Sequence, residues 1–413
     1  MYPTLFRIPF LPDWLADIKA YGVMMMIAFL SGIWLACRRA SRSQANPDTV
    51  LNIGFLALIF GVIGARAMFV LHYWDTRFAN QPNPIAAVFD IHGGGLEFWG
   101  GPLLVIPVVI LYLRYIAKTS VRWFLDITAP SLIWGLAITR IGCFLNGCCW
   151  GAVCLDQHDV NQQRAALPWA VRFPYGSNAM NQQYAFGQLT LPKELIYVFP
   201  SGESSPVFRK LIDKAVADGG KTRKRLEEAK KKAFKAYREQ KTAGADPETL
   251  KRLDERRARA GEALKDYYYK TDIGLIDRHC RKFGLTPGEL SVLASHYPSK
   301  PVHPSQLYAV VNGLIICWFL SALFYYRKRH GIVLGWFLIL YSISRVFLEL
   351  IRADNPLDTF GGITISQGIS ITTFLAGVLW LWIMHKKLPL YSPRAVPYVL
   401  PEEEQPARAR PAS

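Results

Sequence analysis

Five charged side chains stand inside stretches of sequence that are otherwise apolar: Arg66, Arg140, Arg345, Glu349 and Arg352. A charge is costly in an apolar medium, so a charged group kept there usually serves a site. The last three are spaced at i, i+4 and i+7, which predicts that they share one face of a helix. Guanidinium groups bind phosphate oxygens through paired hydrogen bonds, so these residues predict a site for a phosphate-bearing anion. The alternative is that the arginines pair with neighbouring groups or reach toward the membrane surface, and only hold the helices together.

The apolar residues are grouped in blocks long enough to cross a membrane. The chain of 413 residues is 51% hydrophobic with a formal charge of +17, a poor match to an ordinary soluble protein. A bilayer core about 30 Å thick requires roughly 20 apolar residues of helix. We predict an all-α polytopic membrane protein with seven transmembrane helices, the third of them short unless the Gly-rich segment before it re-enters the membrane. The predicted helices are approximately Tyr21–Cys37, Leu51–Tyr73, Trp99–Leu113, Phe124–Phe144, Gln306–Tyr326, Ile332–Ile351 and Gln367–His385.

Lysine and arginine follow the first, third, fifth and seventh predicted helices, for example at Arg39, Arg114, Arg327 and Lys386. Short loops rich in these residues favour the cytoplasmic side of a membrane. We therefore predict an external N-terminus and a cytoplasmic C-terminus. The segment before Tyr21 lacks a charged region followed by a cleavable apolar core, so the first helix is expected to be retained. This topology puts all five buried charges in the outer half of the membrane, where the available anion is a phospholipid head group.

Polar residues and glycines gather where the odd-numbered predicted helices begin. These segments are 21–22, 93–101, 303–308 and 364–367, and the topology puts them at the same outer level as the charges. Each has an ordinary alternative. The glycines could allow close helix packing, or their N–H groups could line a polar cavity. His303 could cap a helix or transfer a proton, and Tyr21 could be a common interfacial tyrosine.

A long polar segment separates the fourth and fifth predicted helices. We divide the chain into four membrane helices (1–145), an extracytoplasmic segment (146–302), three membrane helices (303–387) and a disordered cytoplasmic tail (388–413). Residues 206–270 hold 20 Lys+Arg and 11 Asp+Glu, a net charge of 20 − 11 = +9. They predict a charged helical hairpin, with Asp246 and Pro247 beginning its second helix. It is either solvated or rests on anionic lipid, and nucleic acid is not an expected partner.

Four of the seven cysteines cluster at the outer end of the fourth predicted helix: Cys143, Cys148, Cys149 and Cys154. An external, oxidising location permits disulfides there. Buried thiols or a structural disulfide, a metal site and a reactive nucleophile all remain open. No histidine stands at ligand spacing beside the cysteines, which counts against the metal site.

Several motifs, taken together and in order, resemble the prolipoprotein diacylglyceryl transferase family, and the resemblance covers the seven predicted helices. The motifs are Tyr21-Gly22, Gly64-x-Arg66, Gly94-x-x-x-Phe98-x-Gly100-Gly101, Arg140-Ile141-Gly142-x-Phe144-x-Asn146-Gly147-x-x-Trp150-Gly151, His303-Pro304-Ser305-Gln306-Leu307-Tyr308, Arg345-x-x-x-Glu349-x-x-Arg352 and Thr364-x-x-Gln367.

The resemblance implies transfer of diacylglycerol from phosphatidylglycerol to the thiol of the lipobox cysteine in a prolipoprotein signal peptide, with release of glycerol phosphate. It implies a bacterial inner-membrane enzyme with its active site toward the periplasm and with no metal or organic cofactor. Arg140 and Arg345 would bind the phosphate, Arg66 and Arg352 would stand behind them, and Glu349 would orient the arginines. The remaining substrate-binding residues would be Tyr21, Gly100, Gly101, Asn146, Gly151, His303, Gln306 and Tyr308.

The sequence departs from the family pattern in three places. Trp99 stands where the family usually has a histidine that is a candidate base. The nearest replacements are His92 and Glu97, either of which could accept the thiol proton. Cys143 and Cys148 replace a usual asparagine and acid, and the charged insertion is unusually large.

Two other functions are compatible with the same residues. A carrier or flippase for an anionic lipid could use the arginines as a transport site, although the sequence has no clear internal repeat and its polar residues cluster at one face. An inactive relative that binds lipoprotein precursors would explain the missing histidine.

Overall fold

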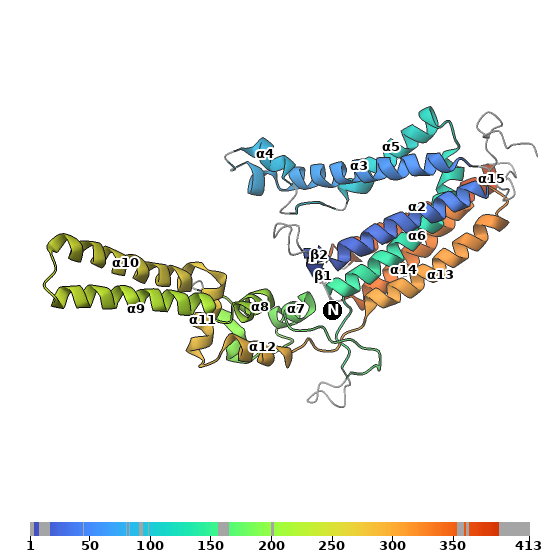
Figure 1. Cartoon of the computed structure of the whole chain (residues 1–413). Helices are drawn as coiled ribbons and strands as arrows, with labels where there is room; N and C mark the ends of the chain where they lie inside the picture. The colour runs from blue at the N-terminus through green and yellow to red at the C-terminus, as the bar shows by residue number, and fades with distance from the viewer. Residues whose placement is uncertain are drawn as a thin grey trace, which may run out of the picture. The chain divides into compact units, whose positions relative to one another are not determined.

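The computed structural model describes residues 4–7, 17–43, 45–79, 81, 83–90, 94–97, 99–155, 165–199, 202–352, 359–360 and 363–387. Its contacts divide the chain into two compact units (Figure 1). One, here called the bundle unit, combines 2–149 with 305–413, and the other, the inserted unit, consists of residues 150–304 together with residue 1. The predicted disordered tail after Leu388 lies outside the described residues.

Long apolar helices form the bundle unit. Six helices in the described part of the chain are long and apolar enough to cross a membrane, which agrees with a polytopic membrane protein. The third predicted helix is shorter, because it begins at Gly100 and its regular part ends at Leu111, before a π-helical turn η2 (Tyr112–Ile116). The helices are α2 (Ala20–Ser41), α3 (Pro47–His72), α5 (Gly100–Leu111), α6 (Val121–Asn146), α13 (Ser305–Tyr326), α14 (Ile332–Ile351) and α15 (Ile365–Lys387).

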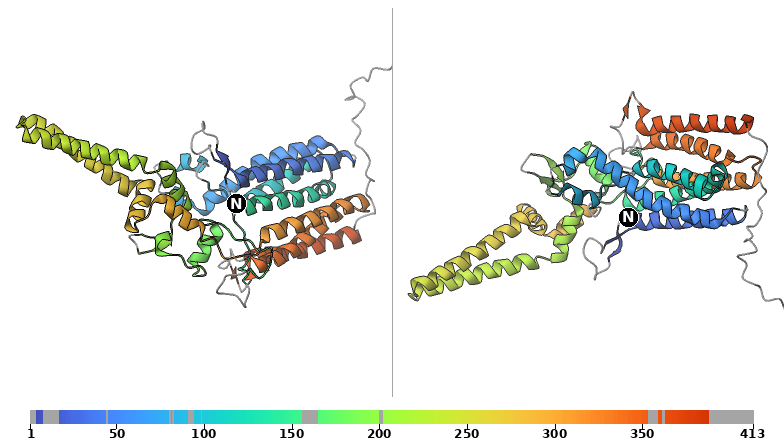
Figure 2. Two further views of the ribbon diagram at one scale, coloured as in Figure 1. Left: turned by 60° about the horizontal axis from the view of Figure 1, so that its bottom comes forward. Right: turned by 90° about the horizontal axis from the view of Figure 1, so that it is seen from above.

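Helix α6 is the centre of this packing. It contacts α2, α13 and α14, while α14 also packs against α15 (Figures 1 and 2). Ile127 and Ile133 of α6 form a core with Leu320 and Phe324 of α13 and Val333 of α14. Because α6 touches three neighbours, a residue on α6 can meet groups from distant parts of the sequence.

A buried polar network fixes the Val121 end of α6. The side chain of Asp126 is fully buried and accepts hydrogen bonds from the N–H groups of Gly331 at 2.7 Å and Leu334 at 3.0 Å. Arg327 forms an ion pair with the same carboxylate at 3.3 Å. Arg39 of α2 donates to the Ile127 carbonyl at 2.9 Å. Since buried charges require partners, this network links α2, α6 and the start of α14.

Helices α3 and α5 pack as a pair through glycines. A Cβ added to Gly64 would lie 2.3 Å from the Gly100 carbonyl oxygen, and one added to Gly100 would lie 2.1 Å from the Gly64 oxygen. Contacts this short are possible only without side chains. The structure therefore favours close helix packing as the role of Gly100, one of the two alternatives that the sequence left open.

Short elements complete the bundle unit. A π-helical turn η1 (Trp74–Phe78) and helix α4 (Pro84–Phe89) follow α3. Two antiparallel ribbons pair β1 (Thr4–Arg7) with β2 (Asp17–Lys19) and β5 (Thr359–Phe360) with β6 (Ile363–Thr364).

The inserted unit has its own core, formed by Met180, Leu195, Ile212, Ile276 and Leu290. An antiparallel ribbon in this unit pairs β3 (Ile196–Val198) with β4 (Ser204–Pro206). Its helices, in chain order, are α7 (Asn178–Ala185), the 3₁₀ turn η4 (Lys193–Leu195), α8 (Arg209–Asp218), α9 (Lys221–Thr242), α10 (Pro247–Lys270), α11 (Asp272–Lys282) and α12 (Pro287–Ser295).

Helices α9 and α10 lie side by side in the charged segment (Figure 1). Asp246 caps α10 by accepting a hydrogen bond from the Thr249 N–H at 2.9 Å, as its sequence pattern predicts. The Tyr237 ring of α9 lies 4.7 Å from the guanidinium carbon of Arg257 on α10. This cation–π contact and a hydrogen bond from the Tyr268 hydroxyl to Glu227 at 3.4 Å both link the two charged helices.

The Gly64→Ala substitution should destabilise the protein, because its methyl group would collide with the Gly100 backbone. Overpacking of this kind costs about 1–3 kcal/mol. Gly261→Ala is the control, since a Cβ there meets no atom within 4 Å and alanine favours a helix. Thermal unfolding of the detergent-solubilised protein should show a lower midpoint for Gly64→Ala and an equal or higher midpoint for Gly261→Ala. Equal stability of Gly64→Ala and the wild type would contradict the glycine contact.

Candidate active site

Three of the predicted charges meet at the end of α14. The Arg345 Nη1 atom lies 2.6 Å from Glu349 Oε2, and the Arg352 Nη1 atom lies 3.7 Å from the same oxygen. The Glu349 side chain is 3% exposed, against 17% for Arg345 and 14% for Arg352. The spacing thus does put the three side chains together, and one carboxylate is shared by two guanidinium groups.

Arg140 joins this group from α6, and Tyr21 joins it from α2. Arg345 interacts electrostatically with both Arg140 and Arg352. Tyr21 packs against Gly142, where an added Cβ would lie 3.3 Å from the tyrosine ring, and it also interacts electrostatically with Arg140. Among the described residues, these three arginines outnumber the carboxylate that pairs with them, which is that of Glu349. The cluster of Tyr21, Arg140, Arg345, Glu349 and Arg352, here called the arginine cluster, therefore favours an anion.

The start of α15 supports Glu349 from its other side. Thr364 donates from its hydroxyl to Glu349 Oε1 over 3.4 Å. Thr364 and Gln367 also bond reciprocally, with the Thr364 N–H donating to Gln367 Oε1 and the Gln367 N–H donating to the Thr364 hydroxyl. This capping pair fixes the helix start and holds the acid between the arginines.

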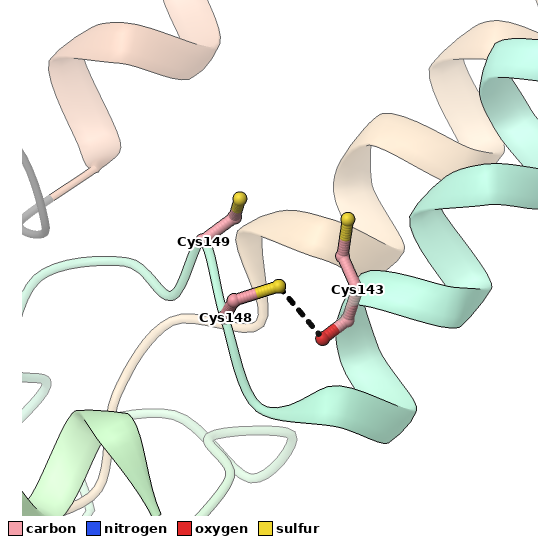
Figure 3. A group of neighbouring side chains, drawn as sticks. All are labelled: Cys143, Cys148 and Cys149. Atoms are coloured by element: carbon pink, nitrogen blue, oxygen red, sulfur yellow. Dashed lines mark hydrogen bonds between the residues drawn. The ribbon is translucent and has the colours of Figure 1, made fainter. Parts of the chain in front are cut away.

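A turn after α6 brings three cysteines together (Figure 3). Helix α6 ends at Asn146, and Gly147 takes a left-handed conformation with φ 75°. This reverses the chain and returns Cys148 and Cys149 to Cys143, so that the three sulfur atoms lie within 4.8 Å of one another. All three are free thiols in the structure.

The cysteine turn is also attached to α13. Gln306 Nε2 donates to the Cys148 carbonyl at 2.7 Å, and the Ser305 hydroxyl donates to the Cys149 carbonyl at 2.6 Å. Gln306 is 1% exposed, and its Oε1 atom has no hydrogen-bond partner among the described residues. A buried acceptor of this kind is suited to a ligand hydroxyl group.

The surroundings of Cys149 lower the pKa of its thiol. Hydrogen bonds with Cys143 and Cys148 have the largest effect, and burial opposes them. The positive charges of Arg352 and Arg140 lower the pKa further. Cys149 thus lies in the field of the arginine cluster, and the two groups form one site.

Arg66 has a different environment from the other arginines. Its guanidinium donates to backbone carbonyls before and within the Gly-rich loop, namely those of Ala87, Val88, Asp90, Gly94 and Gly95, at 2.7–3.2 Å. Both loop glycines have φ values near +86°, at 87° and 85°. Five carbonyls occupy its donors, so in this structure Arg66 organises the loop and does not present a free fork.

The candidate base that the structure describes, Glu97, contacts α3. Glu97 lies 3.2 Å from the His72 Nδ1 atom, and the Glu97 N–H donates to the Ala65 carbonyl at 3.0 Å. His92 lies outside the described residues. In the described part of the chain, the contacts of Glu97 connect it to α3 and not to the arginine cluster.

The other predicted site residues are distributed over both units. Gly151 and His303 belong to the inserted unit, where the Gly151 N–H donates to the His303 carbonyl at 2.9 Å. Asn146 lies within hydrogen-bonding reach of Cys148. Tyr308 lines an apolar groove of about 530 Å³ between α13 and α14. Gly101 packs against the Gly61 backbone.

Three supporting residues had no role in the sequence prediction. Ser305 holds the cysteine turn, Thr364 contacts Glu349, and His72 pairs with Glu97. Ser305 and Thr364 belong to motifs that carry the family resemblance, so their positions could have suggested a role. The sequence gives no comparable indication for His72, because it belongs to none of these motifs and its partner Glu97 is 25 residues away.

Removal of the shared acid should destabilise the bundle. We expect Glu349→Gln to lower the free energy of unfolding by about 3–5 kcal/mol, because two largely buried arginines lose their counter-charge. Added inorganic phosphate should then raise the unfolding midpoint of the variant more than that of the wild type. Glu255→Gln is the control, since Glu255 forms an exposed pair with Arg259 at 3.6 Å. A Glu349→Gln variant of wild-type stability would show that the arginines do not depend on this acid.

Comparison with known proteins agrees with the family suggested by the motifs. Over 378 residues the chain is 25% identical to the phosphatidylglycerol--prolipoprotein diacylglyceryl transferase of Erwinia tasmaniensis, with 89% of each chain covered. The enzyme of that name from Proteus mirabilis is 26% identical over 370 residues, covering 87% of this chain and 86% of the relative. The Nitratidesulfovibrio vulgaris enzyme is 38% identical over 162 residues, 39% of this chain and 56% of the relative. The family model described as prolipoprotein diacylglyceryl transferase matches residues 6–383, and the chain belongs to this family.

Proposed function

We propose that this protein transfers the diacylglyceryl group of phosphatidylglycerol to the cysteine thiol of a prolipoprotein lipobox. The observation that carries the proposal is the arginine cluster, in which Arg345 and Arg352 share the Glu349 carboxylate and Arg140 lies in electrostatic range of Arg345. Relatives that cover most of the chain carry this activity in their names. A phospholipid substrate also matches a site built at the end of helices long enough to span a membrane.

The proposed reaction is a displacement at carbon. The thiolate sulfur attacks the glyceryl carbon that carries the phosphate, a C–S bond forms, and the C–O bond to the phosphate breaks. Glycerol phosphate leaves with the electron pair, and the thiol proton passes to a base. Negative charge therefore grows on the departing phosphate, and fixed positive groups beside it lower the barrier.

Arg140 and Arg345 are the proposed phosphate ligands, with Arg352 behind them. Glu349 holds Arg345 in place, since the two side chains are 2.6 Å apart. Gln306 offers its unpaired Oε1 atom to a glycerol hydroxyl, and Tyr21 and Asn146 are further candidates for glycerol or phosphate oxygens. For Arg66 we propose an indirect role, because its contacts with five carbonyls fix the Gly-rich loop.

We further propose seven membrane spans, with the active site at the periplasmic face of a bacterial inner membrane. Besides the six long helices, the additional span is the third in chain order. It consists of α5 with 12 residues and η2 with 5 residues, 17 together. This length corresponds to roughly 25 Å of helix, slightly less than the hydrocarbon core. The glycine segment before α5 would complete the crossing.

Arg140→Ala and Arg345→Ala should each lower the transfer rate at least about a hundredfold, the usual effect of losing one donor to a developing anion. The purified protein is incubated with phosphatidylglycerol and a lipobox peptide, and the peptide is weighed by mass spectrometry. Arg114→Ala is the matched control, because Arg114 is exposed and lies in η2, which follows α5. Full activity of both cluster variants would refute the phosphate assignment. Lipid binding without a mass gain in the wild type would favour a carrier or an inactive relative.

We propose Glu97 as the proton acceptor because of its place in the Gly-rich motif, and not because of a contact with the arginine cluster. Its 3.2 Å contact with His72 provides a second group that can share the proton. Glu97→Gln keeps the shape of the side chain but removes its basicity, so we expect a slower transfer by about 10²-fold or more. His72→Gln should have a smaller effect. The proposal fails if Glu97→Gln transfers at the wild-type rate across a range of pH. His92→Ala is measured in parallel, because His92 is the other candidate that the sequence supplies.

A further inference from the structure

The three thiols beside the arginine cluster form a compact set of soft ligands. Cys143, in the last turn of α6, is 6% exposed, and Cys148 and Cys149 are partly buried. Their sulfur atoms lie within 4.8 Å of one another, and none forms a disulfide in the structure. A proton-transfer role for Glu97 and a phosphate role for the arginines leave these thiols without a function.

The backbone is held in an unfavourable conformation to make this arrangement. Cys149 has a φ of 61°, a left-handed conformation that costs a residue with a side chain about 1–2 kcal/mol. Bonds from Ser305 and Gln306 to the turn carbonyls, at 2.6 and 2.7 Å, keep it there. Strained residues held by their surroundings are concentrated at functional sites.

The spacing is compatible with a tetrahedral metal ion. Zinc binds thiolate sulfur at about 2.3 Å, so two sulfurs on one tetrahedral zinc lie about 3.8 Å apart. The three cysteine sulfurs lie within 4.8 Å of one another, so each pair has to approach by at most about 1 Å to reach this distance. In Figure 3 the Cys148 thiol points toward the Cys143 carbonyl oxygen, to which it donates at 3.6 Å, and the sulfurs of Cys143 and Cys149 lie on one side of this contact.

The positive charges near the cysteines suit a metal–thiolate centre whose net charge is negative. Three thiolates and Zn²⁺ sum to −3 + 2 = −1. Arg140 and Arg352 act electrostatically on Cys149, and Arg140 stands one helical turn before Cys143. Their positive charges offset the excess negative charge of such a centre. Monovalent copper also accepts three thiolates, but zinc is the ion that keeps a fourth position for a substrate.

We propose that Cys143, Cys148 and Cys149 bind Zn²⁺ as three thiolates, and that the fourth coordination position takes the thiol of the substrate cysteine. This inference rests on the transfer reaction proposed above and gives it a means of activating the nucleophile. It assigns a metal site where the family resemblance implied none. It also gives a function to the cysteines that replace the family's usual residues at 143 and 148.

The proposed step balances in atoms and charge. Binding of zinc releases the three cysteine protons, and the substrate thiol then displaces a water molecule and loses its own proton to Glu97 or to solvent. The zinc-bound sulfur supplies the electron pair of the new C–S bond, and the phosphate takes the pair of the broken C–O bond. The thioether product is a neutral and weaker ligand, so it leaves and water returns.

Metal content tests the site directly. The full-length protein is purified in detergent without chelators and analysed for zinc by mass spectrometry, and we expect about one zinc per chain. Cys143→Ser and Cys149→Ser should lose it. Cys37→Ser and Cys154→Ser should keep it, because neither belongs to the cluster. Absence of zinc from the wild type, retention in both cluster variants, or a disulfide between cluster cysteines in the purified protein would each overturn the proposal.

Cobalt substitution tests whether the substrate thiol takes the fourth coordination position of the metal. It uses the wild-type protein, so a variant that fails to fold cannot affect the result. Co²⁺ added to the zinc-free wild-type protein should give sulfur-to-metal charge-transfer bands and the strong visible bands of a tetrahedral ion. A lipobox peptide with its cysteine should shift these bands, whereas the same peptide with serine should not. Bands that the cysteine peptide leaves unchanged would refute substrate coordination.

The two proposals fail in different ways. If the zinc-free protein transfers diacylglycerol at the full rate, the zinc inference is wrong and the transferase function stands. If cobalt and the cysteine peptide give the expected bands but no diacylglyceryl group is transferred, the metal site stands and the proposed function fails.

Discussion

The cost of placing charge in an apolar helical bundle is the constraint on which the rest of the structure depends. Every buried charge must be paired, hydrogen-bonded or provided with a ligand. The two ends of α6 meet this requirement in different ways. At the Val121 end, Asp126 accepts two backbone N–H bonds and pairs with Arg327, so the protein supplies the partners itself. In the arginine cluster, the acid that the described residues supply is Glu349, which Arg345 and Arg352 share.

This difference is the basis on which we propose a structural role for the Asp126 network and a binding role for the arginine cluster. A network that satisfies its own charges ties helices together, whereas one that leaves positive charge over attracts an anion. Arg66 illustrates the same point within one residue type, because five backbone carbonyls occupy its guanidinium and leave it to organise the Gly-rich loop. Arginines in apolar segments therefore do not share one role, and their partners determine which role each has.

The chemistry proposed for the site needs two opposite electrostatic environments close together. A sulfur nucleophile must lose a proton, and a phosphate must leave with negative charge. Arg140 and Arg352 could serve both, since each belongs to the arginine cluster and each acts electrostatically on Cys149. A cysteine-bound cation beside these arginines would hold the attacking sulfur next to the position of the departing phosphate.

The sequence by itself determined the elements whose signals are local. The length of the apolar segment predicted α14 with the same bounds, Ile332–Ile351, as in the structure. The residue spacing predicted that Arg345 and Glu349 lie on one helix face, and Asp246 with Pro247 predicted the start of α10. Only the tertiary structure decided that Arg66 is engaged by carbonyls, that Glu97 pairs with His72, and that Cys143, Cys148 and Cys149 converge beside the arginines. The physical reason is that helix length and periodicity depend on neighbouring residues, whereas these contacts join groups through turns and between helices, where backbone angles and packing decide which atoms meet.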